Sequence, residues 1–360
     1  MMVDLSDSPD RGTFPNRILI IRLSAIGDVV FSSPLVDALK EVYQGADIFW
    51  LAESPVVPLL EHHPHLRDVI VWPRKEWGEL LRSGRWLALL KEIVRFKQRL
   101  RRYQFDLVID AQGLFKSAVL AWMTGAVRRV GFASKEPTRA LLTERIEKDT
   151  GPAISSEYRA MAKHLGCQSN VFPMKVCVPP AVEVWADAFR GDEPYVAICP
   201  FTTRPQKHWP EAHWQVLAKS LVARGWRVVV LGGPADSVSA DRIFADIRVE
   251  SMVGKAALLE SAALVGHADL VIGVDTGLTH MGWAFKVPTI ALFGSTCPYR
   301  DLGGLRGAVL YKNMTCSPCR RKPVCGGTYD CLAALYPDSV IGSMAGLLRD
   351  KSVSGSVVAS

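Results

Sequence analysis

The sequence predicts an α/β protein with two domains, each built around a parallel sheet, and three observations lead to this prediction. The chain has 360 residues, enough for two domains of ordinary size that each bury a core. Apolar runs at residues 17–23 and 270–274 each end in a glycine-bearing turn that opens a helical pattern. Strands that are apolar on both faces and alternate with helices are typical of parallel sheets. We therefore expect strand–turn–helix units in both halves.

The composition is that of a globular protein, with 49% hydrophobic and 22% charged residues. No apolar run reaches the ~20 residues that cross a bilayer. Residues 1–16 lack the basic start and apolar core of a signal peptide, so we expect a cytoplasmic chain with disordered tails at 1–16 and 351–360. In that compartment the eight cysteines indicate thiols or metal ligands rather than disulfides.

The first unit of the amino-terminal half contains a candidate catalytic carboxylate. A buried strand, Arg17 to Leu23, precedes a turn that ends in Gly27 and Asp28, and a helix is expected over residues 29–43. Ligands of doubly wound sheets bind beyond the carboxyl ends of the strands, so this turn should face a ligand cleft. Asp28 is then either a simple helix cap or a general base that projects into the cleft.

A strongly basic segment, residues 74–102, follows strands expected at 47–51 and 68–72 and a helix at 55–62. The segment holds ten Lys or Arg and three Glu, so its charge of +7 equals that of the whole chain. Trp and Leu recur in it at mostly helical spacing. Such a helix suits an anionic membrane surface; the alternative is a packed helix with a basic solvated face. Nucleic acid is not expected, because no binding motif accompanies the charge.

A second candidate ligand-binding turn follows the strand expected at residues 105–110. The segment Asp110 to Ser117 closes that strand and opens a helix. Lys116 within it is either an exposed helix lysine or a ligand for an anionic acceptor, since cations bind carboxylates and phosphates. Lys135 and Arg139 add positive charge near the same edge. A helix at 155–165 then leads to a hinge expected within residues 175–190.

The carboxyl-terminal half opens with a strand at residues 195–199 and a loop suited to a diphosphate. Thr202, Thr203 and Lys207 lie just before a helix, where hydroxyls, a cation and free backbone N–H groups can hold phosphate oxygens. The alternative is an ordinary capped turn. The sequence has no Asp-x-Asp triplet for a metal, so side chains are expected to neutralise the charge of the leaving group.

Two further turns complete this edge of the second sheet. The strand at 226–231 is followed by Asp236, whose carboxylate suits ribose hydroxyls. The unit at 270–294 reads as a strand, a turn, a helix over 278–285 and a second strand at 289–293. In its turn, Asp275 and Thr276 are expected to cap the helix and Gly277 to let the backbone approach a ligand, with His280 one turn in.

Four cysteines near the carboxyl end, Cys316, Cys319, Cys325 and Cys331, leave a metal site open. Cys-x2-Cys with two further cysteines could ligate zinc or an iron–sulfur cluster. The second pair is spaced Cys-x5-Cys, which departs from the zinc-ribbon pattern, so we expect free thiols that order a loop and no metal. A last helix is expected over residues 339–348.

Four of these segments together resemble the ADP-heptose:lipopolysaccharide heptosyltransferases, glycosyltransferase family 9. The matching motifs are Gly27-Asp28, residues 110–117, Thr-Thr-Arg…Lys-His-Trp-Pro from residue 202, and Asp-Thr-Gly-Leu-Thr-His from residue 275. The resemblance runs from about residue 17 to 348. It implies a GT-B fold of two facing Rossmann-like domains, which we place at 17–185 for the acceptor and 186–350 for the nucleotide sugar.

The resemblance also implies roles for the site residues. Asp28 would be the base of an inverting transfer of heptose onto the Kdo–lipid A inner core, with no cofactor, at the inner face of the inner membrane. The residues expected to bind the donor are Thr202, Thr203, Lys207, Asp236, Ala256, Asp275, Thr276, Gly277 and His280. Those expected to bind the acceptor are Gly27, Lys116, Lys135 and Arg139. Similar cysteine-bearing tails recur in the family without implying a required metal.

Several alternatives stay open at this point. The Thr-Thr-Arg motif is most similar to the enzymes that add the first heptose (heptosyltransferase I), whereas the cysteine tail resembles those that add the second (heptosyltransferase II). Another GT-B transferase would use a different nucleotide sugar. A nucleotide-binding envelope-assembly protein without catalytic activity would keep the loops but tolerate loss of Asp28.

Overall fold

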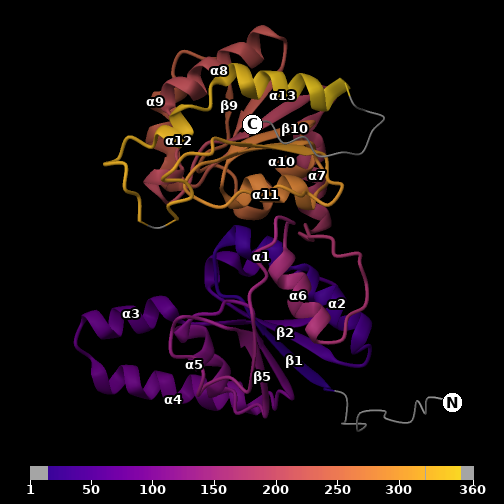
Figure 1. The fold of residues 1–360 in the computed structure, drawn as a ribbon, viewed down its shortest axis with the longest axis vertical. Helices are drawn as coiled ribbons and strands as arrows, with labels where there is room; N and C mark the ends of the chain where they lie inside the picture. The colour runs from indigo at the N-terminus through magenta and orange to yellow at the C-terminus, as the bar shows by residue number, and fades with distance from the viewer. Residues whose placement is uncertain (1–14, 321, 350–360) are drawn as a thin grey trace, which may run out of the picture.

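Two six-stranded parallel sheets form the protein in a computed structural model, which describes residues 15–320 and 322–349 (Figure 1). The strand order is β3-β2-β1-β4-β5-β6 in the amino-terminal sheet and β12-β11-β10-β7-β8-β9 in the carboxyl-terminal one. Each sheet therefore runs outward in both directions from its first strand, which is the doubly wound arrangement. This confirms the two Rossmann-like halves expected from the sequence. The predicted tails, 1–16 and 351–360, lie almost entirely outside the described residues.

The amino-terminal half holds six strands and seven helices among the described residues. Its strands are β1 (Arg17–Ile21), β2 (Asp47–Ala52), β3 (Leu66–Val71), β4 (Leu107–Asp110), β5 (Arg128–Phe132) and β6 (Glu144–Ile146). Its helices are α1 (Ile26–Ser32), α2 (Pro34–Val42), the 3-10 helix η1 (Ser54–Leu59), α3 (Arg74–Arg82), α4 (Trp86–Arg102), α5 (Phe115–Met123) and α6 (Ser156–His164). The single helix expected at 29–43 is two helices, because Pro34 has no N–H to continue α1 and instead begins α2.

The carboxyl-terminal half repeats the same plan. Its strands are β7 (Tyr195–Cys199), β8 (Arg227–Val230), β9 (Glu250–Ser251), β10 (Leu270–Val274), β11 (Thr289–Phe293) and β12 (Gly307–Tyr311). Its helices are α7 (Pro180–Arg190), η2 (Pro205–Lys207), α8 (Glu211–Ala223), η3 (Pro234–Asp236), α9 (Ser237–Phe244), α10 (Leu258–Gly266), α11 (Gly277–Ala284), α12 (Asp330–Ala333) and α13 (Pro337–Arg349). The helix α13 packs on α8, β11 and β12 of its own half. No helix in the described ranges combines the length and apolar character of a membrane span.

Each sheet reverses its direction of winding between two central strands. In the first sheet β1 pairs in parallel with both β2 and β4, and in the second β7 pairs in parallel with both β8 and β10. All residues of β4, β7 and β10 are buried, as apolar strands covered on both faces require. At such a reversal the loops diverge and leave a crevice at the carboxyl ends of the strands. The turns after β1 and β10 therefore occupy the ligand-binding edge of each sheet.

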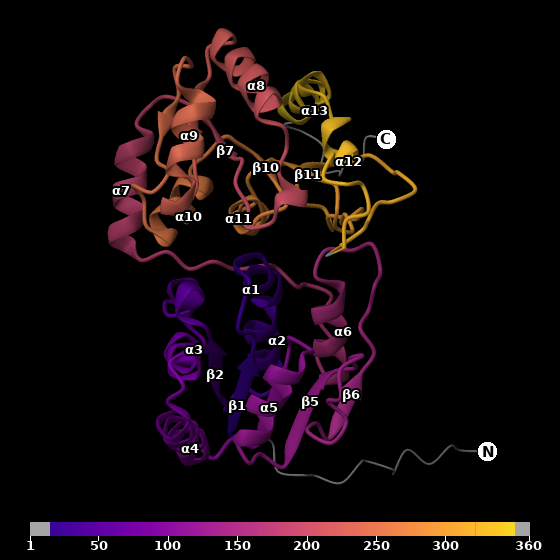
Figure 2. The same ribbon diagram turned by 90° about the vertical axis from the view of Figure 1, so that its left-hand side faces the viewer.

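The two halves meet through the helices that follow those turns. Helix α1 packs against α11, and Figure 2 shows the two lying one above the other between the sheets. A second contact joins the backbone of residues 152–154 to that of Arg300 and Asp301. Helix α7, in which the boundary between the domains was predicted, packs on α10 of the carboxyl-terminal half.

Candidate active site

Two glycines bring the ligand-binding turns of the halves into direct contact. A Cβ added to Gly27 would lie 2.6 Å from Cδ2 of His280, and one added to Gly277 would lie 2.3 Å from Cγ2 of Ile26. Contacts this short do not occur between a side chain and a real Cβ, so only glycine fits at either position. The turn after β1 and the turn after β10 thus pack directly against each other, and we treat them as the amino-terminal and carboxyl-terminal walls of a candidate site.

On the amino-terminal wall, Asp28 is anchored and still exposed. Its Oδ2 contacts the guanidinium of Arg22 and accepts the N–H of Ala25 at 3.2 Å. Arg22 directly follows β1, is 7% exposed, and donates through Nη1 to the carbonyl of Ala111 at 3.0 Å. The Asp28 side chain nevertheless keeps 48% of its surface exposed. Asp28 therefore caps α1, as one interpretation of the sequence expected, and also offers a carboxylate to a ligand.

Arg22 is a member of this site that the sequence analysis did not include. Burial opposes its charge, but Tyr158 and Asp28 raise the pKa of the guanidinium above its ordinary value. Its Nε is buried without a hydrogen-bond partner in the described part of the chain. The signal in the sequence was an arginine at the end of an otherwise apolar strand, six residues before Asp28, where a charge costs free energy unless it is paired.

On the carboxyl-terminal wall, Asp275 is the centre of a network. Its Oδ1 lies 3.0 Å from Nε2 of His280, and its Oδ2 lies 2.5 Å from Nζ of Lys207 and accepts the hydroxyl of Thr296 at 2.6 Å. Burial alone would raise the pKa of Asp275, but His280 and Lys207 hold it well below its usual range. The expected capping of α11 by the side chains of Asp275 and Thr276 is wrong, because the helix has no side-chain cap and the carboxylate is used elsewhere.

The predicted diphosphate loop lies beside this network. Thr202 is half-buried and Thr203 exposed, and Lys207, with 16% of its side chain exposed, ends η2. The loop is held by Nε2 of His208, which lies 2.8 Å from the carbonyl of Thr202. Because β7 and β10 are adjacent, the Lys207–Asp275 pair spans the reversal of the second sheet. The structure thus brings Lys207, Asp275 and His280 together. Thr202 and Thr203 lie on the same loop as Lys207.

The remaining candidate donor residues follow the outer strands of this sheet. Asp236 comes after β8, and its Oδ2 accepts the N–H of Gly233 at 2.9 Å, so it serves at least as the cap of η3. Ala256 is partly exposed, just before α10. Since β8 lies next to β7 and β9 next to β8 in a parallel sheet, both positions are at the same carboxyl edge as the predicted diphosphate loop, on the far side of β7 from β10.

The other residues predicted to bind the acceptor belong to the amino-terminal half. Nζ of Lys116 is 3.4 Å from Oε1 of Glu53 and 5.5 Å from the centre of the Trp72 ring. Lys135 and Arg139 are exposed on the loop between β5 and β6. The neighbouring Glu136 accepts the N–H of Phe115, which ties that loop to the start of α5 beside Lys116. The loop with Lys135 and Arg139 therefore adjoins the edge that carries Lys116, whose partner is Glu53.

Aromatic side chains close the interface between the walls. The ring of Phe31 on α1 lies 4.5 Å from that of His280 and 4.9 Å from that of Tyr299. Burial, then Glu157, Asp28 and Asp275, raise the pKa of the Tyr299 phenol well above its usual value. Tyr299 therefore stays protonated between acids from both halves. The sequence did not predict this position of Tyr299, because a tyrosine six residues after a buried strand belongs to no local pattern.

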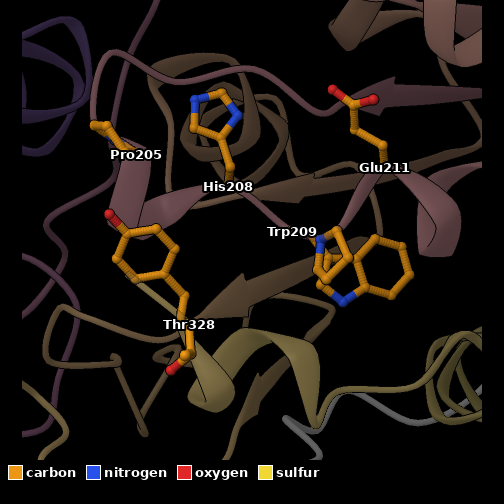
Figure 3. A pocket seen from close by; sticks show the side chains of 7 residues that line it. Pro205, His208, Trp209, Glu211 and Thr328 are labelled. Atoms are coloured by element: carbon orange, nitrogen blue, oxygen red, sulfur yellow. The ribbon is translucent and has the colours of Figure 1, made fainter. Parts of the chain in front are cut away.

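A separate pocket of about 370 Å³ lies between the segment that leads into α8 and the cysteine tail (Figure 3). Five of its lining residues come from the segment before and at the start of α8 and two from the cysteine tail: Pro205, His208, Trp209, Pro210, Glu211, Thr328 and Tyr329. None of the predicted donor or acceptor residues lines it. The four cysteines of the tail are free thiols, and no group of three or more His, Cys, Asp or Glu within the described residues is arranged to hold a metal ion.

Comparison with known proteins points to one family. The model of "Glycosyltransferase family 9 (heptosyltransferase)" matches residues 93–328. Lipopolysaccharide heptosyltransferase 1 of Pseudomonas aeruginosa is 32% identical over 319 residues, covering 85% of this chain and 86% of its own. Lipooligosaccharide heptosyltransferase 2 of Haemophilus influenzae is 28% identical, covering 78% and 84%.

Solved structures share the fold. A family 9 glycosyl transferase from Veillonella parvula superposes with a TM-score of 0.76 at 20% identity, covering 93% of this chain and 98% of the other. The heptosyltransferase WaaC of Escherichia coli with ADP gives 0.71 at 24% identity, covering 92% and 99%. These likenesses confirm the two-domain arrangement expected from the sequence.

Proposed function

The chain belongs to glycosyltransferase family 9, the heptosyltransferase family, and on that premise we propose that it transfers heptose from ADP-L-glycero-D-manno-heptose to the Kdo–lipid A inner core of lipopolysaccharide. One observation carries the proposal. The exposed carboxylate of Asp28 comes just after β1, the Lys207–Asp275 pair joins the segments after β7 and β10, and α1 packs against α11, so both groups lie where a sheet reverses its winding, close to the contact between the halves. That is the arrangement that a base and a diphosphate site need.

In the proposed reaction Asp28 takes the proton of the acceptor hydroxyl. The hydroxyl oxygen forms a bond to the anomeric carbon while the bond from that carbon to the diphosphate breaks, so ADP leaves from the opposite face and the configuration inverts. Arg22 holds one oxygen of the Asp28 carboxylate and leaves the side chain accessible. Lys207 and the hydroxyls of Thr202 and Thr203 stabilise the negative charge on the departing ADP.

The donor phosphates are proposed to be neutralised without a metal. Lys207 supplies a cation, and the start of α11 supplies free backbone N–H groups, because no side chain caps that helix. Gly277 lets the ligand approach this backbone closely. Asp236 and Ala256 would border the nucleoside, and Lys116, Lys135 and Arg139 would bind the anionic groups of the acceptor.

The similarity to heptosyltransferase 1 of Pseudomonas aeruginosa favours the first-heptose acceptor over the second. The alternatives remain a heptosyltransferase II, a GT-B transferase with another nucleotide sugar, and a binding protein without catalytic activity. We propose that the protein acts in the cytoplasm, bound peripherally to the inner face of the inner membrane, because the acceptor is anchored there by its acyl chains.

The test is incubation with ADP-heptose and two acceptors, Kdo–lipid A and its mono-heptosylated product, followed by mass spectrometry. A gain of one heptose on the first acceptor alone supports the proposal, and a gain on the second alone supports heptosyltransferase II. If neither acceptor gained a heptose, and UDP or GDP raised the melting temperature more than ADP did, the choice of donor would be overturned. Nucleotide binding without turnover of any sugar donor would support the binding protein.

A further inference from the structure

The helical hairpin formed by α3 and α4 has an inner face that accounts for its packing. Phe96 and Leu100 of α4 are buried in the core of the amino-terminal half, with Ile93 partly buried beside them. Trp77 of α3 meets Phe96 edge to face, with ring centres 5.6 Å apart. The spacing of these residues on α4 puts them on one side of the helix. These contacts join the hairpin to the core of the amino-terminal half.

The hairpin nevertheless carries a second apolar surface, which we call the outer face: Leu81, Trp86, Leu87, Leu90 and Val94. Trp86 is 63% exposed and Leu87 86% exposed. Trp86, Leu90 and Val94 are four residues apart and form a single stripe along α4. Leu81 lies at the other side of the short turn that joins the helices. Exposed apolar residues gathered in this way mark an interaction site rather than ordinary surface.

Basic residues surround the outer face. Residues 74–102 carry a net charge of +7, and further along the stripe Nζ of Lys97 lies 4.5 Å from the centre of the Trp122 ring on α5. A second copy of this chain would bring an equal positive charge against the same surface, and the two would repel. Leu and Trp beside Lys and Arg instead match the acyl and headgroup layers of an anionic bilayer.

The base of the hairpin is joined to the acceptor edge of the site. Nη1 of Arg74, the first residue of α3, lies 2.9 Å from Oε2 of Glu53, whose other oxygen pairs with Lys116. From there α3 and α4 extend beside the amino-terminal sheet (Figure 1). Helix α4 has 17 residues and is therefore about 25 Å long. A membrane bound along the hairpin would lie next to the edge where the acceptor sugars enter.

We propose that the outer face of the hairpin binds the surface of an anionic phospholipid bilayer and so presents the acceptor edge to lipid-anchored substrate. The benefit for catalysis rests on the proposed function, whereas the binding itself does not. Lipid binding has two components, burial of Trp86, Leu87 and Leu90 in the interface and attraction of the basic residues to the headgroups. Both components have to be present for full affinity.

The binding test is flotation of the full chain with vesicles of phosphatidylethanolamine and phosphatidylglycerol, compared with vesicles of phosphatidylcholine. The wild-type protein should float with the anionic vesicles and detach as salt rises. The triple variant Trp86→Ser/Leu87→Ser/Leu90→Ser should bind at least tenfold more weakly while keeping its melting temperature. The matched control is Val184→Ser/Val238→Ser, which removes two residues exposed by 71% and 75% on the carboxyl-terminal half and should bind as wild type.

Equal vesicle binding by the triple variant and the wild type would overturn the proposal, as would a wild type that ignores anionic vesicles. If the wild type sedimented as a dimer and the triple variant as a monomer, the outer face would instead be the contact with a second copy of the chain. Turnover measured on two acceptors distinguishes the membrane proposal from the proposed function. The triple variant should match wild type on an acceptor without acyl chains and fall at least tenfold on acceptor embedded in vesicles. If the wild type turned over neither acceptor, the proposed function would fail while the flotation result still decided the membrane proposal.

Discussion

Gly27 in the turn after β1 lies directly against the imidazole of His280 in the turn after β10. Gly27 directly precedes Asp28, the proposed base, and His280 is hydrogen-bonded to Asp275. The contact therefore links the surroundings of Asp28 to those of Asp275. The ring of Phe31 is tilted by 44° against the same imidazole, with the two ring centres 4.5 Å apart. The distance between the acceptor and donor turns is therefore set by a glycine, because any larger residue would have to push the halves apart.

Gly27→Ala is expected to lower kcat/KM about 10- to 100-fold without unfolding either half. The added methyl group would lie 2.6 Å from Cδ2 of His280, and relief of such overpacking costs about 1–3 kcal/mol. Steady-state kinetics and a melting curve check this. Gly45→Ala is the matched control, since nothing lies within 4 Å of a Cβ there, and it should behave as wild type. Full activity of Gly27→Ala would mean that the working enzyme does not bring these turns together.

Asp28→Asn is expected to reduce kcat by about 10² to 10⁴, the usual contribution of a general base. The amide keeps the shape of the side chain and can still accept the N–H of Ala25, but it cannot take the proton of the acceptor hydroxyl. Calorimetric titration with ADP should give an affinity close to that of wild type, because the proposed ADP-binding residues belong to the other half of the protein. A variant that retains most of its turnover would remove Asp28 from the chemistry.

Arg22 is expected to act by positioning Asp28. Arg22→Ala should lower kcat by about tenfold or more with little change in the KM for ADP-heptose, because the carboxylate loses its anchor while the donor loops are untouched. Arg22→Lys should restore part of kcat, since it keeps the charge but not the bond from Nη1 to Ala111. If Arg22→Lys were as slow as Arg22→Ala while both melted normally, the charge would not be what Asp28 requires.

The sequence predicted the scaffold of the site better than its contacts. Strands β10 and β11 match the predicted runs 270–274 and 289–293 residue for residue, because short apolar segments bounded by turn residues have strong local signals. Asp275 shows the limit. The local pattern predicted a cap, whereas the carboxylate pairs with Lys207, 68 residues earlier, and accepts the hydroxyl of Thr296, 21 residues later. Partners at such separations follow from the order of strands in the sheet and not from neighbouring residues.

Lys207 and Asp275 are expected to act as one unit. Lys207→Met should lower kcat/KM for the donor by about 10²-fold, since it removes the cation nearest the diphosphate loop. Asp275→Asn should also slow the reaction by releasing both Lys207 and His280. Nζ of Lys207 and Oδ2 of Asp275 are 2.5 Å apart, so the effects of the two substitutions should not be additive. The kcat/KM of the double variant should be higher than the product of the two single effects predicts, with a coupling free energy of about 1 kcal/mol or more. Strict additivity would show that Lys207 works without Asp275.

His63 gives a prediction for stability against pH. Burial lowers its pKa to about 4, with Asp37 opposing and Lys175 and His65 adding to that shift. The ring is neutral in the folded state, where Nδ1 accepts the N–H of His65 at 3.2 Å. Below about pH 6.5 the unfolded chain binds a proton that the folded protein does not, so the free energy of unfolding falls as pH drops from about 6.5 to about 4.

The expected loss from His63 over that window is on the order of 2–3 kcal/mol, and it should be missing from His63→Asn. The Asn carbonyl can replace Nδ1 as an acceptor but does not titrate. Urea unfolding at pH 7.5 and pH 4.5 measures the loss for each protein. His62→Asn is the matched control, because it makes the same substitution at a neighbouring histidine that is exposed. If the free energy of unfolding fell equally in His63→Asn and in the wild type, the acid sensitivity would come from groups other than His63.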